Sequence, residues 1–161
     1  MAIFFSGSEL VNIAIGIERN GLAFYQSLTR TGKDLMARGT YKYLADMEKK
    51  HLKTFQDMLD TVSEYKPPEI YTEEYQLYLK ALVDSMVFTD DKVARQMAEK
   101  ITSSAEAIQI GLGAEKDSIL YYSEMRNLVR ERDRKVVDRI IEEEKSHLRQ
   151  LSELKRKLAA R

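Results

Sequence analysis

The sequence predicts an all-α protein: a four-helix bundle in which a long, partly helical crossover joins the second long helix to the third. Apolar residues recur at gaps of three and four through most of the 161 residues, which is the period of amphipathic helices. The alternating pattern typical of strands is scarce. The two prolines, Pro67 and Pro68, are adjacent, so strong helix breaking by proline is expected at one place.

The first two long helices are predicted from signals at their ends. The segment SGSE at residues 6–9 is a capping box, and the helix after it is expected to run to about Thr29, ahead of Gly32. The second is expected from about Asp34 to Ser63, because the prolines that follow cannot continue it.

The crossover and the last two long helices follow. Residues 71–88 and 90–101 are expected to form two shorter helices. Ser103 or Ser104 is expected to cap the third long helix, which carries AEAIQIGLGAEKDSILYYSEM. The fourth is expected over roughly residues 130–159.

Composition and charge exclude several classes of function. The 26 basic residues balance the 26 acidic ones, so no net charge favours nucleic acid or a membrane surface as a partner. No apolar run reaches the roughly 18 residues of a membrane span, and residues 1–5 are too short for a signal sequence. We therefore expect one cytoplasmic domain over residues 1–161. Since the sequence has no cysteine, a metal would need carboxylate and imidazole ligands.

The chain contains an internal repeat. IGIERNGLAFY, from Ile15, aligns with LGAEKDSILYY, from Leu112. EKKHL, from Glu48, aligns with EKSHL, from Glu144. The two offsets, 97 and 96 residues, are nearly equal, which indicates that one helix pair is used twice in a pseudo-twofold arrangement.

Six polar residues interrupt the apolar seams of the four long helices. Each seam has apolar residues at alternating gaps of three and four, as on the core-facing side of a bundle helix. Every seam includes one glutamate, and in two of them a histidine follows three residues later on the same face. The six residues are Glu18, Glu48, His51, Glu115, Glu144 and His147.

Buried together, these side chains require a compensating positive charge, because each buried carboxylate costs several kcal/mol. The seams hold no lysine or arginine, whereas two divalent cations would cancel four negative charges. Mixed oxygen and nitrogen ligands suit iron or manganese, and this pattern of glutamates and Glu-x-x-His pairs is that of dinuclear carboxylate bundles. The alternative is a structural bundle whose buried polar groups pair with one another, which leaves the negative charge unexplained.

The sequence resembles the rubrerythrin-like branch of the ferritin-like di-iron carboxylate superfamily over nearly its whole length. AIGIERNGLAFYQSL and GAEKDSILYYSEM are similar to that family's first and third helices, and ADMEKKHL and IIEEEKSHL to its second and fourth. The resemblance implies that the six seam residues bind two iron ions, with manganese as the alternative. It also implies that Glu48 and Glu144 bridge the ions, while Glu18 and Glu115 are terminal ligands.

The sequence departs from the rubrerythrin pattern in two ways. Rubrerythrins have a rubredoxin-like iron–tetracysteine domain that supplies electrons, so a chain without cysteine needs an external donor such as a rubredoxin-type protein. They also have an extra glutamate three residues after the third-helix ligand, where this sequence has Ser118. With a histidine in both repeats, the ligand set is in this respect similar to that of bacterioferritin.

The residues beside the seams have more than one explanation. Tyr25 and Tyr122 either pack in the core with a hydrogen-bonded hydroxyl or act as redox or proton-relay groups near the metals, and the two roles are compatible. Glu142 and Glu143 adjoin Glu144 but lie off the seam, so we expect them to be solvated.

The resemblance implies an oxidoreductase that reduces hydrogen peroxide or dioxygen by two electrons, a peroxide-scavenging or oxidase role in oxidative stress. Two alternatives stay open: oxidation of ferrous iron for storage, as in bacterioferritin-like proteins, and an interaction module that the metals only stabilise. Neither nucleic acid nor a membrane is expected as a partner. A homodimer is expected, and the crossover aromatics Tyr71, Tyr75 and Tyr78 would cover either the bundle or the dimer partner.

Overall fold

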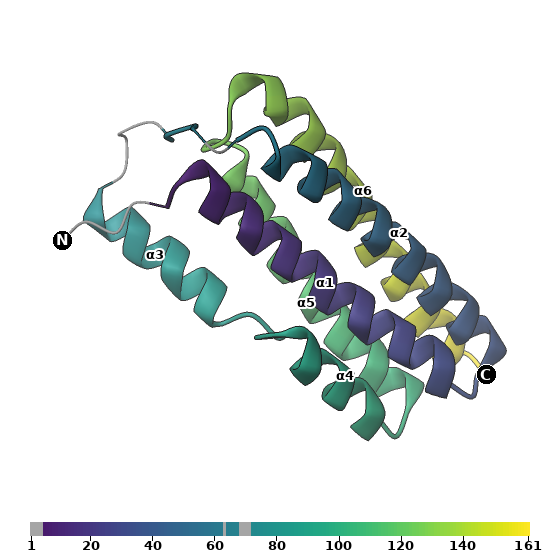
Figure 1. The fold of residues 1–161 in the computed structure, drawn as a ribbon. Coiled ribbons are helices and arrows are strands. Elements are labelled where there is room, and N and C mark those ends of the chain that lie inside the picture. The colour runs from purple at the N-terminus through teal and green to yellow at the C-terminus, as the bar shows by residue number, and fades with distance from the viewer. Residues whose placement is uncertain (1–4, 63, 68–71) are drawn as a thin grey trace.

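The computed structural model describes residues 5–62, 64–67 and 72–161. Four long helices form a bundle: α1 (Gly7–Thr31), α2 (Leu35–Leu59), α5 (Ser104–Met125) and α6 (Glu131–Ala159) (Figure 1). The crossover contains α3 (Glu73–Asp84) and α4 (Asp91–Lys100). Because the described residues form helices and no strand, the prediction of an all-α bundle is confirmed.

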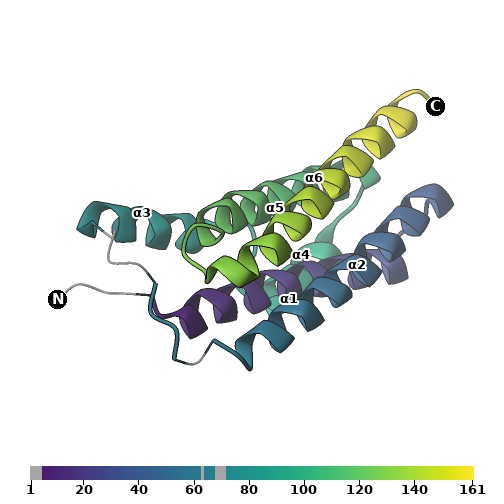
Figure 2. The same ribbon diagram turned by 90° about the horizontal axis from the view of Figure 1, so that it is seen from above.

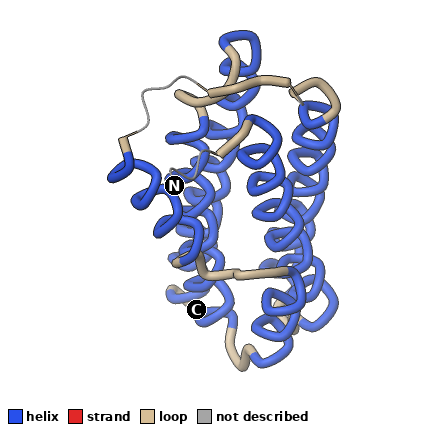
Figure 3. Tube along the Cα trace, turned by 60° about the vertical axis from the view of Figure 1, so that its left-hand side comes forward, coloured by secondary structure: helices blue, strands red, loops and turns tan. Residues whose placement is uncertain are grey.

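The bundle consists of two antiparallel helix hairpins, α1–α2 and α5–α6. Seen from above, α1 and α2 lie in one layer and α5 and α6 in the other (Figure 2). In the crossover, α3 contacts α5 and α4 contacts α1. The link between α3 and α4 crosses the bundle part-way along its length, not at an end (Figure 3). No helix among the described residues is long and apolar enough to cross a membrane.

Two of the predicted caps are present. Ser6 Oγ accepts a hydrogen bond from the backbone N–H of Glu9, and the Glu9 carboxylate accepts one from the backbone N–H of Ser6. Ser103 caps α5 by accepting from the backbone N–H of Glu106 at 3.1 Å. These bonds satisfy amide groups that the first turn of a helix leaves without partners.

α2 and α3 both end earlier than the sequence predicts. α2 ends at Leu59, because a tight turn in which the amide of Thr61 bonds to the carbonyl of Met58 closes it before the prolines are reached. α3 ends at Asp84, and the amide of Val87 then donates to the Asp117 carboxylate on α5 at 2.8 Å. A contact with a residue distant in the sequence therefore directs the chain across the bundle at this point. Of the residues predicted at these boundaries, Ser63, Pro68 and Tyr71 lie outside the described residues.

The apolar core is divided into two clusters along the bundle axis. One includes Leu10, Phe55 and Ile140, and the other includes Phe24 and Leu151. In each long helix, the seam glutamate lies in sequence between the residues of one cluster and those of the other. A polar layer therefore crosses the middle of the bundle.

Some residues of α3 in the crossover pack against the bundle, and others are exposed. Leu79 is fully buried, and the hydroxyl of Tyr75 donates to Glu124 on α5 at 2.6 Å. Leu77 and Tyr78 are exposed, at 61% and 46%. α3 therefore packs on α5 through one face, while Leu77 and Tyr78 lie at the surface among exposed charged residues.

Candidate metal centre

The structure brings all six predicted seam residues together in the middle of the bundle. None of them is more than 5% exposed. They form two groups in which the ligand-type atoms lie within 4.8 Å of one another, and both groups contain Glu48 and Glu144. The His51 half consists of Glu18, Glu48, His51 and Glu144, and the His147 half of Glu48, Glu115, Glu144 and His147.

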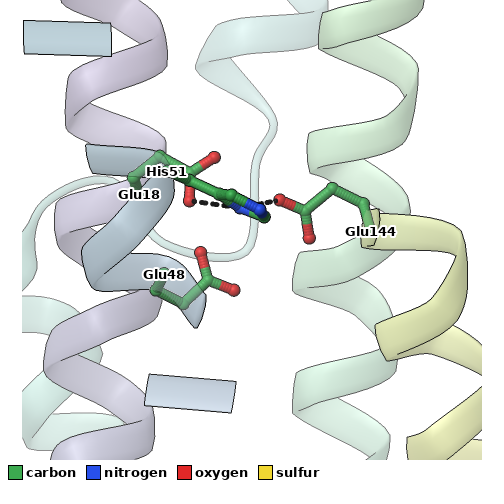
Figure 4. A group of neighbouring side chains, drawn as sticks. All are labelled: Glu18, Glu48, His51 and Glu144. Atoms are coloured by element: carbon green, nitrogen blue, oxygen red, sulfur yellow. Dashed lines mark ion pairs between the residues drawn. The ribbon is translucent and has the colours of Figure 1, made fainter. Parts of the chain in front are cut away.

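His51 faces the centre through Nδ1. This atom lies 2.9 Å from Oε1 of Glu144 and 3.4 Å from Oε2 of Glu18, contacts that Figure 4 marks between α2, α6 and α1. Neither contact has the geometry of a hydrogen bond, so Nδ1 has no hydrogen-bond partner. The Glu48 carboxylate lies beside this group (Figure 4).

His147 faces the same centre from α6, also through Nδ1. This atom hydrogen-bonds to Oε2 of Glu144 at 3.0 Å, and it lies 3.6 Å from Oε2 of Glu115 and 3.8 Å from Oε1 of Glu48. The two imidazole rings are stacked, with centroids 5.6 Å apart. The two halves are therefore adjacent and related by the sequence repeat.

The two predicted tyrosines donate hydrogen bonds to the unshared glutamates, Glu18 and Glu115, each of which belongs to only one half of the centre. The hydroxyl of Tyr25 on α1 donates to Oε1 of Glu115 on α5 at 2.5 Å, and the hydroxyl of Tyr122 on α5 donates to Oε1 of Glu18 on α1. Burial and the nearby carboxylates raise the pKa of both hydroxyls well above the usual value. Both tyrosines therefore keep their protons and act as hydrogen-bond donors.

The carboxylates respond differently to the same burial. Burial and the charges of neighbouring glutamates raise the pKa of Glu48 well above its usual value. Burial and the charge of Glu144 raise the pKa of Glu115 to about 8, against the opposing effect of His147. Burial would also raise the pKa of Glu144, but its contacts with His147 and His51 outweigh this effect and hold the value well below the usual range.

The imidazoles carry the compensating charge in the metal-free protein. Burial lowers the pKa of both rings, but contacts with carboxylates more than reverse this effect. Contacts with Glu144 and Glu18 raise the pKa of His51 to about 11. Contacts with Glu115 and Glu144 raise that of His147 to about 9. Protons on imidazoles and carboxylic acids therefore supply the positive charge that metal ions would otherwise bring.

The donor atoms of this centre fit metal ions better than they fit one another. Buried polar atoms in native proteins are rarely left without a partner, yet four atoms that face this centre have none: Glu18 Oε2, His51 Nδ1, Glu115 Oε2 and Glu144 Oε1. All are carboxylate oxygens or an imidazole nitrogen, the ligand types of iron and manganese. Four carboxylates would also neutralise two divalent ions.

Glu143 was expected to be solvated, and that prediction is only partly correct. Its Oε2 lies 2.7 Å from Nε2 of His51, the nitrogen that points away from the centre, and its side chain is 35% exposed. The neighbouring Glu142 is exposed and pairs with Lys145, as expected. One signal in the sequence could have indicated this contact: Glu143 directly precedes the seam residue Glu144, and from this position on α6 its side chain reaches His51 on α2.

A small pocket reaches the centre beneath the link between α3 and α4. It has about 20 Å³ of space for the centre of a water-sized molecule, and its lining includes Glu48 and Glu115 together with Gly21 and Ser118. Gly21 and Ser118 are equivalent in the sequence repeat, since each follows an unshared glutamate by three residues. Small residues at both positions leave this space open.

Comparison with known proteins gives two matches to this arrangement. The model of the family described as Rubrerythrin matches residues 9–155. A crystal structure described as that of a ferritin-like diiron-carboxylate protein from Thermotoga maritima superposes with a TM-score of 0.69 at 29% sequence identity, and the alignment covers 95% of this chain and 96% of that one. The comparison with curated proteins gives no match.

Proposed function

We propose that this chain, which belongs to the rubrerythrin family, binds two metal ions at its six buried glutamates and histidines and reduces hydrogen peroxide or dioxygen there. The family and the buried cluster indicate a dinuclear metal site. The observation that carries the proposal is that two ligand groups share Glu48 and Glu144. One shared pair of carboxylates suits two ions held close together.

Iron is the metal that we propose, because the reaction requires two electrons. Two bound ferrous ions would supply one electron each, so that hydrogen peroxide and two protons give two waters, or dioxygen and two protons give hydrogen peroxide. We propose that an external protein then returns the two electrons, since none of the 161 residues is a cysteine that could bind a rubredoxin-type iron.

The protein's own groups orient the ligands and exclude water. Tyr25 and Tyr122 each occupy one oxygen of an unshared glutamate, which leaves Oε2 of Glu115 and Oε2 of Glu18 without partners. The apolar clusters on either side keep bulk water from the centre. The tyrosine hydroxyls also hold protons next to two ligands, and a proton-relay role for them is part of this proposal.

The size of the pocket supports a small oxidant. A site needs roughly 10–15 Å³ of such space to hold one water, so the 20 Å³ beside Glu48 and Glu115 accommodates a molecule of about that size. Hydrogen peroxide and dioxygen are this small, whereas an organic substrate would require the helices to move apart. The pocket therefore favours reduction of a small oxidant over oxygenation of an organic compound.

The test is to load the metal-free protein anaerobically with ferrous iron, measure bound iron per chain, and follow the absorption spectrum during titration with hydrogen peroxide and then dioxygen. We expect two irons per chain and rapid oxidation by peroxide without mineral growth. Glu48→Ala and Glu144→Ala, which each remove a shared carboxylate, should lower the bound iron. Unchanged iron content in both variants would rule out this centre.

Iron oxidation for storage is the second candidate, and one observation favours it: Ser118 stands where rubrerythrins have their extra glutamate, while both repeats have a histidine. Storage requires a closed cage and continued uptake of iron. Light scattering on the purified protein distinguishes the two functions, because we expect a small oligomer such as a homodimer for the oxidoreductase. A cage whose iron content grows with repeated ferrous additions would favour storage.

A further inference from the structure

The two histidines of the centre differ on their outer sides. Nε2 of His51 has Glu143 as its partner, at 2.7 Å. Nε2 of His147 is buried and has no hydrogen-bond partner, and the ring of Tyr43 lies edge-on to this histidine at a centroid distance of 6.3 Å. The two halves of the centre therefore have similar ligands but different support.

The sequence repeat identifies the cause of this difference. Glu143 immediately precedes Glu144, and the equivalent residue before Glu48 is Met47. A methionine has no charge, and its thioether is a weak hydrogen-bond acceptor. The otherwise matched halves therefore differ in that a carboxylate supports His51, while a methionine occupies the equivalent position on α2.

An outer carboxylate strengthens a histidine ligand in three ways. It fixes the tautomer, holds the ring in orientation and makes the metal-binding nitrogen more basic, and losing such a partner typically lowers metal affinity about 10–100-fold. When Nδ1 of a neutral imidazole binds a metal, its proton lies on Nε2. In His51 that proton has an acceptor in Glu143, whereas in His147 it is buried without one, which is costly.

We propose that Glu143 is a positioning residue that makes the two metal sites unequal, so that the His51 half binds the first divalent ion and the His147 half the second. This inference rests on the proposed binding of two metals but not on the reduction of an oxidant. It predicts a protein with one tightly held ion and one ion that exchanges more readily.

The experiment is a titration of the metal-free protein with Co²⁺ under anaerobic conditions, followed by calorimetry and by the visible spectrum of the bound ion. We expect two binding steps whose affinities differ by about 10–100-fold. His51→Ala should remove the tight step, and His147→Ala the weak one. Equal steps in the unaltered protein, or a tight step that survives His51→Ala, would overturn the proposal.

Substitutions of residues that are not metal ligands distinguish the direct contact between Glu143 and His51 from a general effect of negative charge near the centre. Glu143→Met should weaken the first step about 10–100-fold, while Met47→Glu should strengthen the second. The matched control is Glu142→Met, which removes a neighbouring charge that does not contact a histidine. If it weakens the first step as much as Glu143→Met does, the effect is general electrostatics and the proposal is wrong.

A conservative variant guards against misfolding. Glu143→Gln keeps an acceptor oxygen for Nε2 of His51 without the charge, so its first step should lie between those of the unaltered protein and Glu143→Met. Circular dichroism establishes that each variant keeps its helices.

Unequal Co²⁺ binding without oxidant reduction by the iron-loaded protein would leave this inference standing and overturn the proposed function alone. Absence of any binding would overturn both.

Discussion

The hydroxyl of Tyr122 on α5 donates a hydrogen bond to Oε1 of Glu18 on α1, and Oε2 of the same carboxylate is buried without a partner. The repeat reproduces this relationship with Tyr25 and Glu115 in the opposite direction across the bundle. Each tyrosine therefore determines which oxygen of Glu18 or Glu115 remains available to a metal. It does so from a helix other than the one that carries the glutamate.

Tyr122→Phe removes this restraint, and we expect two effects. The free energy of unfolding of the metal-loaded protein should fall by about 1.5–3 kcal/mol, the usual contribution of a hydrogen bond to a charged group. Metal affinity should also fall, because Glu18 can then rotate. Denaturant titration measures the first effect and calorimetry the second.

Tyr121→Phe is the matched control for this prediction. Tyr121 is equally buried and adjacent in the sequence, but its hydroxyl donates to the backbone carbonyl of Leu10 at 2.7 Å. We expect it to lower stability without changing metal affinity. If both variants bind metal as the unaltered protein does, the hydrogen bond of Tyr122 is only structural.

Gly21 is needed because of the space that Glu48 occupies. A Cβ at this position would lie 3.2 Å from the carboxyl carbon of Glu48, whereas a Cβ at Gly16, on the same helix, would meet nothing within 4 Å. Gly→Ala in a helix interior gains up to about 1 kcal/mol of stability. We expect Gly16→Ala to show this gain and Gly21→Ala to lose it and to bind metal more weakly, because Glu48 serves both halves.

The same denaturation and metal titrations check both glycine variants. Equal stabilisation by the two substitutions, with metal affinity unchanged, would show that the Glu48 carboxylate shifts without consequence.

Metal binding should release protons and strengthen as pH rises. Three ligands hold protons at neutral pH in the metal-free protein: Glu115, with a pKa of about 8, His147, with one of about 9, and His51, with one of about 11. Burial and the neighbouring glutamates also raise the pKa of Glu48. A metal must displace these protons. Raising the pH toward the values for Glu115 and His147 therefore lowers the cost of binding.

Calorimetry in buffers of different ionisation enthalpy measures the number of protons released, and Mn²⁺ affinity from about pH 6 to pH 8 measures the trend. Glu115→Gln, which has no proton to lose at this position, should release fewer. An affinity independent of pH across this range would contradict the prediction.

Ser118 should control access of the oxidant to the centre. Ser118→Leu fills the pocket beside Glu115, so we expect oxidation of the iron-loaded protein by hydrogen peroxide to slow by about tenfold or more. Ser123→Leu is the control, because this serine also bonds to the carbonyl four residues earlier but is exposed. Stopped-flow absorption measures both rates, and equal rates would place the route of the oxidant elsewhere.

The six seam residues could be identified from the sequence because helical periodicity determines which face of a helix each side chain occupies. The prediction depended on four long helices, each of which the structure contains. Periodicity does not tell which side chain of a neighbouring helix lies opposite. For this reason Glu143, one position off the seam, was predicted to be solvated although it contacts His51.

The ends of α2 and α3 depend on interactions that the local sequence does not reveal. The link after α3 is fixed by the bond from the amide of Val87 to Asp117, thirty residues away. The pocket likewise arises from two small residues, Gly21 and Ser118, that only the folded bundle places together. Their equivalence in the repeat was visible in the sequence, but its meaning was not.

The polar layer between the two apolar clusters also affects how long the protein survives. Removing the metals would leave the middle of all four long helices with buried polar atoms that have no partner, while the clusters at either end stay intact. Local opening should then begin at the centre of the bundle, where amide hydrogen exchange would be fastest. Since proteases attack opened chains, the protein's turnover would follow the supply of the metal, with a shortage shortening its lifetime.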